Sequence, residues 1–72
     1  MARELKYELV KKIKKLSETE GSRKELNIIK WGDAEPVYDI RKWRGAQPTK
    51  GISLTEAEAK ELLKALQKAL GW

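Results

Sequence analysis

The stretch from Val37 to Trp43, V-Y-D-I-R-K-W, alternates apolar and polar residues, and this alternation constrains the fold of the whole chain. In an extended strand, successive side chains point to opposite faces. Tyr38 and Ile40 therefore share one face and supply an apolar pair for a core. The other face carries the guanidinium of Arg41 and the indole of Trp43, an arrangement suited to phosphates and unstacked bases. The sequence predicts a sheet with one buried face and one face open to a ligand.

Residues 23–31, R-K-E-L-N-I-I-K-W, alternate in the same way and predict a second strand. Leu26 and Ile28 point to its apolar face. Its polar face carries three candidate ligand-binding residues: Arg23, Asn27 and Trp31. Glu25 and Asp39 also fall on the polar face of the sheet. We expect these two carboxylates to pair with Arg23 or Arg41 and to orient those side chains.

Turn residues divide the rest of the predicted sheet. Residues 17–22, S-E-T-E-G-S, predict a polar connector with Gly21 as its turn residue. The sequence G-D-A-E-P at 32–36 is typical of a hairpin connection. Residues 44–49, R-G-A-Q-P-T, predict a longer loop, after which a short strand resumes at Lys50.

Residues 3–16 allow two interpretations. Leu5, Leu9, Ile13 and Leu16 recur at helical spacing, and local periodicity favours an amphipathic helix. A strand is the alternative, with Leu5, Tyr7, Leu9 and Ile13 on one face. Tertiary context can override a propensity of this size.

The C-terminal segment predicts a helix. T-E-A-E at 55–58 is a capping box, in which the Thr55 hydroxyl accepts from the Glu58 amide and the Glu58 carboxylate reaches back. Gly71 is placed to end the helix in a left-handed conformation. An apolar stripe follows the helical period. It consists of Ala59, Leu62, Leu63, Leu66 and Leu70, widened by Ala65 and Ala69.

Length and composition limit the possibilities. The 72 residues predict one domain, and a chain of this size has a marginal core as a monomer. The sequence has no cysteine or histidine, so we expect no disulfide, no metal site and no cofactor. Oligomerisation is the remaining common way to enlarge such a core.

The charge balance is basic, with 16 Lys and Arg against 11 Asp and Glu, a net charge of +5. This excess is compatible either with a solvated surface or with an anionic partner. No apolar run approaches a membrane span of about 20 residues, and no signal peptide is visible. We expect a cytoplasmic protein with no membrane partner.

Four segments together resemble the positive cofactor four (transcriptional coactivator p15) family, particularly its short bacterial members. They are K-E-L-N at 24–27, W-G-D-A-E-P at 31–36, Y-D-I-R-K-W at 38–43 and K-G-I-S-L-T at 50–55. The resemblance covers nearly the whole of residues 1–72. It implies an α+β fold, a curved four-stranded antiparallel sheet followed by one helix (β-β-β-β-α). It also implies a homodimer formed through the helices and binding of single-stranded DNA with little sequence preference.

The resemblance implies roles for individual residues. Trp31 matches the base-stacking aromatic of the family, and Arg41 and Lys50 match backbone-contacting cations. Trp43 lies near a second family aromatic. The resemblance also favours a strand for the first segment, which would place Lys12 and Lys14 on the polar face. The implied nucleic-acid-binding residues are Lys12, Lys14, Arg23, Asn27, Trp31, Arg41, Trp43 and Lys50. The implied dimer interface consists of Leu62, Leu63, Ala65, Leu66, Ala69 and Leu70.

Other functions stay open at this point. A protein-interaction module that dimerises through its helix and binds an acidic peptide on the sheet would need the cations but not the exposed indoles. A double-stranded DNA or RNA binder would place an element in a groove. We expect no enzyme, because the sequence has no recognisable acid–base pair, nucleophile or phosphate-binding glycine loop. The expected partner is single-stranded DNA, with RNA as an open alternative.

Overall fold

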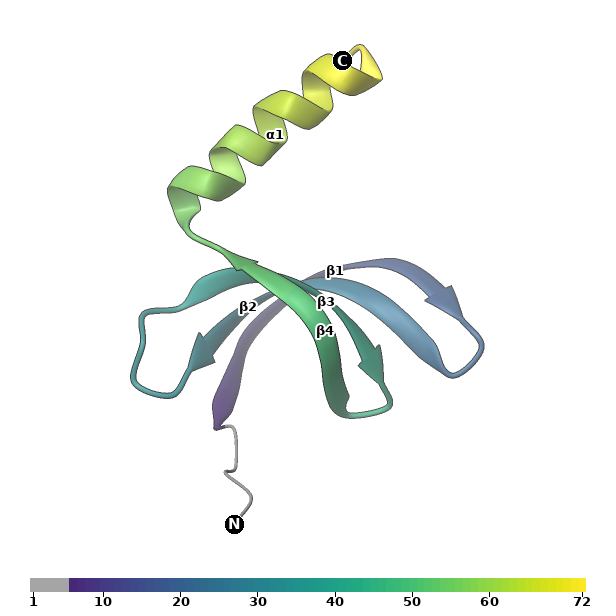
Figure 1. The fold of residues 1–72 in the computed structure, drawn as a ribbon, viewed down its shortest axis with the longest axis vertical. Coiled ribbons are helices and arrows are strands. Elements are labelled where there is room, and N and C mark those ends of the chain that lie inside the picture. The colour runs from purple at the N-terminus through teal and green to yellow at the C-terminus, as the bar shows by residue number, and fades with distance from the viewer. Residues whose placement is uncertain (1–5) are drawn as a thin grey trace.

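Four antiparallel strands form one sheet in the computed structural model, which describes residues 6–72 (Figure 1). The strands are β1 (Tyr7–Thr19), β2 (Ser22–Trp31), β3 (Val37–Arg44) and β4 (Gln47–Leu54), and the helix α1 spans Glu56–Leu70. The sheet order β1-β2-β3-β4 leaves β1 and β4 as its edges. The predicted α+β fold with β-β-β-β-α order is confirmed. Within residues 6–72, no helix is long and apolar enough to cross a membrane.

The first segment is a strand, as the resemblance implied, although its apolar residues have helical spacing. β1 pairs with β2 along its whole length, but the register shifts between Leu9 and Lys11, between Lys12 and Lys14, and between Lys15 and Ser17. Each irregularity adds a residue on one strand and so changes which side chains share a face. Leu9, opposite Ile29, therefore shares a face with Tyr7, whereas Ile13 lies on the other face beside Leu26. The apolar residues with helical spacing thus do not share one face of the strand, and the predicted common face of Leu9 and Ile13 is wrong. Leu5 lies outside the described residues.

Two of the three predicted connections are shorter in the structure, while the one at 32–36 is as predicted. β1 continues to Thr19 and β2 begins at Ser22, so the predicted connector at 17–22 shrinks to a tight turn. β4 begins at Gln47, so the predicted loop at 44–49 is mostly strand. Gly21 and Gly45 lie in these turns with φ of 79° and 58°. Because glycine adopts positive φ without steric cost, each turn needs only two residues, and the strands are correspondingly longer.

The sheet arches strongly, and α1 stands on its convex side (Figure 1). The concave face is the more buried of the two. Its buried residues are Glu25, Asn27, Ile29, Asp39 and Trp43. The sequence predicted the opposite, a buried apolar face and an open polar one. The apolar residues of the convex face are only partly buried, namely Leu26, Ile28, Tyr38 and Ile40. Curvature draws the concave side chains together, whereas a single helix covers little of the convex face.

Helix α1 has the predicted ends. The Thr55 hydroxyl accepts from the Glu58 amide at 3.1 Å, and the Glu58 carboxylate accepts from the Thr55 amide at 2.8 Å. Gly71 is left-handed, with φ of 76°, and the Trp72 amide donates to the Gln67 carbonyl at 2.8 Å. These contacts satisfy some of the free backbone groups at both ends.

Within residues 6–72, the apolar stripe of α1 has no complete partner, because no residue of the helix is buried. Leu66, near the middle of the stripe, is 47% exposed. An apolar groove of about 330 Å³ lies between the helix and the convex face. Its lining residues are Ile13, Leu26, Tyr38, Ile40, Ala59, Leu62, Leu63 and Leu66.

Gly51 lies where β4 has no room for a side chain. It pairs with Arg41, next to an irregularity in the β3–β4 register. A Cβ at Gly51 would lie 2.6 Å from the Ile40 carbonyl oxygen, 2.7 Å from the Arg41 Cα and closer still to the Arg41 Cβ. Close approach of the β3 backbone therefore requires glycine here.

We expect Gly51→Ala to lower the free energy of unfolding by about 1–3 kcal/mol, because the added methyl group forces a shift of the backbone. Chemical denaturation compared with Gln47→Ala, an exposed position on the same strand, measures the effect. Equal stability of the two variants would contradict this account.

Candidate nucleic-acid interface

A buried carboxylate fixes the arginine at the centre of the concave face. Asp39 is fully buried (0% exposed) on β3, and Arg41 follows two residues later on the same face. Arg41 donates from Nε to Asp39 Oδ1 at 2.6 Å and from Nη2 to Asp39 Oδ2 at 2.8 Å. Its Nη1 donates to the Thr49 carbonyl at 2.8 Å. The predicted pairing of Asp39 with Arg41 is confirmed, and it is bidentate, which fixes the plane of the guanidinium.

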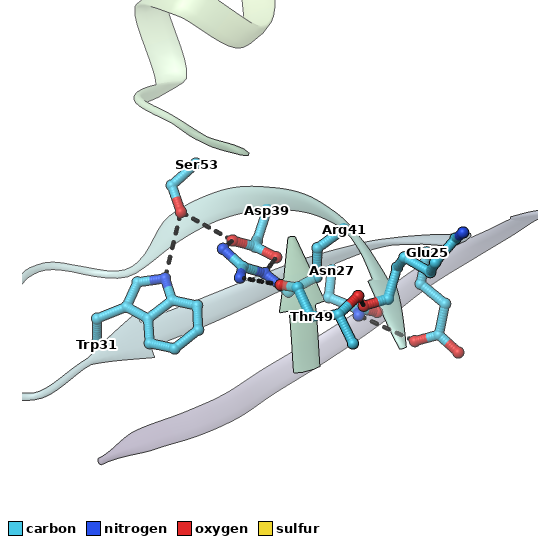
Figure 2. A network of polar contacts seen from close by, with 8 residues as sticks. Glu25, Asn27, Trp31, Asp39, Arg41, Thr49 and Ser53 are labelled. Atoms are coloured by element: carbon cyan, nitrogen blue, oxygen red, sulfur yellow. Dashed lines mark hydrogen bonds and ion pairs between the residues drawn. The ribbon is translucent and has the colours of Figure 1, made fainter. Parts of the chain in front are cut away.

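Ser53 connects this ion pair to an indole (Figure 2). The Ser53 hydroxyl donates to Asp39 Oδ2 at 2.8 Å and accepts from the Trp31 Nε1 at 3.2 Å. The guanidinium carbon of Arg41 lies 4.8 Å from the centroid of the Trp31 ring, within the range of a cation–π interaction. Four side chains from β2, β3 and β4 thus form a closed ring of contacts. We call Trp31, Asp39, Arg41 and Ser53 the Trp31–Arg41 network.

Tyr7 adds a third aromatic ring to the concave face. Its ring centroid lies 5.4 Å from that of Trp31 and 6.0 Å from that of Trp43. The sequence analysis placed Tyr7 on the apolar face and so missed it, along with Ser53. The register of β1 places Tyr7 opposite Trp31. No local sequence pattern predicts this pairing, because it depends on the irregularities of β1.

Trp43 differs from Trp31 in its exposure. It is only 4% exposed, and its Nε1 is buried without a hydrogen-bond partner among residues 6–72. The structure corrects the expectation that Trp43 presents an open ring to a ligand, because the concave face closes over it. Trp31 is partly exposed and keeps a surface for contact.

A second polar cluster lies beside the network on the same face. Arg23 pairs with the Glu25 carboxylate, as predicted, and Asn27 Nδ2 donates to Glu25 Oε1 at 3.0 Å. Burial acts to raise the pKa of Glu25, but hydrogen bonds from Asn27 and Arg23, with the charges of Arg23 and Lys12, outweigh it and lower the pKa. Glu25 is therefore held as a carboxylate.

The predicted lysines separate onto different faces. Lys12 pairs with Asn27 and lies on the concave face, as predicted. Lys14 pairs with Leu26, so it shares the convex face, and its predicted place beside Lys12 is wrong because an irregularity separates them. Lys50 lies at the irregularity of the β3–β4 register between Arg41 and Trp43, and it lines a hollow together with Lys24 and Lys42 of the convex face. The concave face brings together Lys12, Arg23, Asn27, Trp31, Arg41 and Trp43.

The lowered pKa of Glu25 predicts a pH-dependent contribution to stability. A carboxyl whose pKa falls on folding stabilises the fold above its unfolded pKa of about 4.3 and loses this contribution as pH falls through the folded value. We expect the difference in unfolding free energy between the wild type and Glu25→Gln to shrink as pH falls below about 4.3. Denaturant titrations across this range measure it, and a difference independent of pH would contradict the assignment.

Comparison with known proteins identifies the family of this chain. No curated protein matched the chain. A family model described as Transcriptional Coactivator p15 (PC4) matches residues 18–65, which include β2, β3, β4 and most of α1. Because this match covers more than half of the 72 residues, the chain belongs to the transcriptional coactivator p15 (PC4) family.

Proposed function

We propose that this protein binds single-stranded DNA with little sequence preference, through the concave face of its sheet and as a homodimer. Membership of the p15 (PC4) family supports nucleic-acid binding in general. The Trp31–Arg41 network carries the specific proposal, because it holds an indole and a guanidinium 4.8 Å apart on one surface. An unpaired strand offers a base and a phosphate at every nucleotide, and these two groups match that pair.

Arg41 retains capacity for a phosphate. A guanidinium has five N–H donors, and three hydrogen bonds from Arg41 go to Asp39 and Thr49. The side chain is 14% exposed. Because the carboxylate and the carbonyl fix its orientation, little side-chain entropy is lost when a phosphate binds to the remaining donors.

Trp31 supplies the complementary contact. Stacking on an indole tolerates every base, because each base has a π face, and it explains binding without sequence preference. The alternative, an acidic peptide on the sheet, would use the cations without needing the ring. RNA would use the same contacts as DNA. We further propose a non-enzymatic role in the cytoplasm, in transcription, replication or repair.

We expect Trp31→Ala to weaken binding of oligo-dT by roughly 5- to 150-fold, the range for loss of about one stacked base at 1–3 kcal/mol. Because Trp31 is partly exposed, most of the thermal stability should remain. Fluorescence anisotropy and melting temperature on the same variant measure both effects.

Trp72→Ala is the matched control, because Trp72 is 91% exposed and lies beyond the end of α1. It removes the same side chain away from the sheet and should bind oligo-dT as the wild type does. If Trp31→Ala binds as well as this control, the stacking role is wrong. If the wild type binds an acidic peptide but does not bind oligo-dT, the alternative function is favoured.

The uncovered apolar surfaces support the proposed homodimer. Leucines along α1 remain exposed, at Leu62, Leu63, Leu66 and Leu70, and the first three border the groove on the convex face. Such a continuous apolar surface is costly in water. A second copy can cover it by packing its own helix against this one, with Ala65 and Ala69 allowing a close approach.

We expect Leu66→Glu to abolish the dimer, because it places an unpaired charge in the shared apolar core. Sedimentation should show a dimer for the wild type and a monomer or unfolded chain for the variant. Gln67→Glu adds the same charge at the neighbouring position outside the stripe and should remain dimeric. A monomeric wild type would refute the proposal.

A further inference from the structure

A basic hollow on the convex side of the sheet has no role in the function proposed above. It has a volume of about 530 Å³ and lies between β2, β3 and β4. Four exposed cations line it, which we call the convex-face basic cluster: Lys24, Lys42, Arg44 and Lys50. Ile40, Arg41, Thr49 and Gly51 complete the lining. No carboxylate is among these residues.

The cluster is electrostatically unfavourable for the isolated chain. Lys24 and Lys42 lie directly opposite each other in the β2–β3 register, and like charges at such a pair destabilise a sheet. None of the four cations takes part in an ion pair within residues 6–72. By contrast, Arg23 and Arg41 on the concave face each pair with a carboxylate. An anion in the hollow would relieve the repulsion.

The hollow is continuous with the concave-face site. Arg41 lines the hollow and also belongs to the Trp31–Arg41 network. Gly51 lies opposite Arg41 on β4, the edge strand, and has no side chain to separate the two sites. A chain of phosphates that reaches Arg41 on the concave face therefore has only the edge of β4 to cross before it meets Lys50.

We propose that the convex-face basic cluster binds the phosphodiester backbone of the same DNA strand as it continues past Arg41 and over β4. This inference rests on the proposed function and extends it. Charge complementarity selects the occupant, since the lining offers ammonium and guanidinium groups without a compensating acid. The aliphatic stems of the lysines and Ile40 supply an apolar floor, so the contact needs no base recognition.

The test compares short and long oligonucleotides on one variant. Oligo-dT of about 6 nucleotides fills the concave site, whereas about 20 nucleotides can also reach the cluster. We expect Lys24→Gln/Lys42→Gln to bind the short oligonucleotide as the wild type does. For the long one, loss of two phosphate contacts should weaken binding roughly 25-fold at about 0.1 M salt and flatten the slope of log K against log salt by about 1.4.

Two further measurements separate the cluster from general charge effects. Lys60→Gln/Lys68→Gln removes the same charge from exposed positions of α1 and should leave the length dependence unchanged. The melting temperature of Lys24→Gln/Lys42→Gln without DNA should rise slightly, because the repulsion between the opposed lysines is gone. A purely structural role of these lysines would lower it.

The remaining outcomes overturn the inference in distinguishable ways. If the variant and the wild type bind the long oligonucleotide equally while Trp31→Ala weakens both lengths, the cluster is not a DNA site and the proposed function stands. If the variant alters the oligomeric mass, the cluster belongs to an interface with a second copy. If the wild type binds neither oligonucleotide, the proposed function fails and the inference fails with it.

Discussion

The carboxylate of Asp39 is the constraint on which the concave face depends. A fully buried charge is costly unless it is paired and hydrogen-bonded. Here Arg41 and Ser53 supply the partners, and each of them makes a further contact that reaches across the sheet. Removing one partner would leave the carboxylate incompletely satisfied in the interior, so the network is maintained as a unit. Gly51 is part of the same constraint, because only a glycine lets β4 approach Arg41 closely.

The curvature of the sheet reverses the usual burial of the two faces, in which the apolar face is buried and the polar face is exposed. A concave face of polar and charged residues is buried, whereas leucines and isoleucines on the convex side and on α1 are exposed. A small domain cannot fill two cores, and here the apolar residues of the convex side and of α1 remain largely exposed. The buried ion pairs lie on the concave face, whereas the apolar groove lies between α1 and the convex face. The proposed homodimer would therefore use a different face of the sheet from the one that holds the polar network.

Local chemistry made part of this structure predictable from the sequence. Thr55, Glu58 and Gly71 act through contacts within a few residues, so the helix ends could be predicted. The pairing of Asp39 with Arg41 follows from alternation on a single strand. The faces of Tyr7 and Lys14 could not be predicted, because they depend on irregularities in β1 that only pairing with β2 reveals. The burial of Trp43 likewise depends on how far the whole sheet curves, which no segment encodes alone.

The hydrogen bonding of Trp31 bears on sequence preference. An indole has one donor, and here it is directed to Ser53 rather than to solvent. The guanidinium beside it has three of its N–H bonds directed to Asp39 and Thr49. Recognition of a particular base needs donors and acceptors directed at base edges. Most of the N–H donors of Trp31 and Arg41 instead form hydrogen bonds within the protein. What Trp31 still presents is the π surface of a ring, and what Arg41 still presents is positive charge. The proposed function needs only these features, because a stacked base and a phosphate are common to every nucleotide.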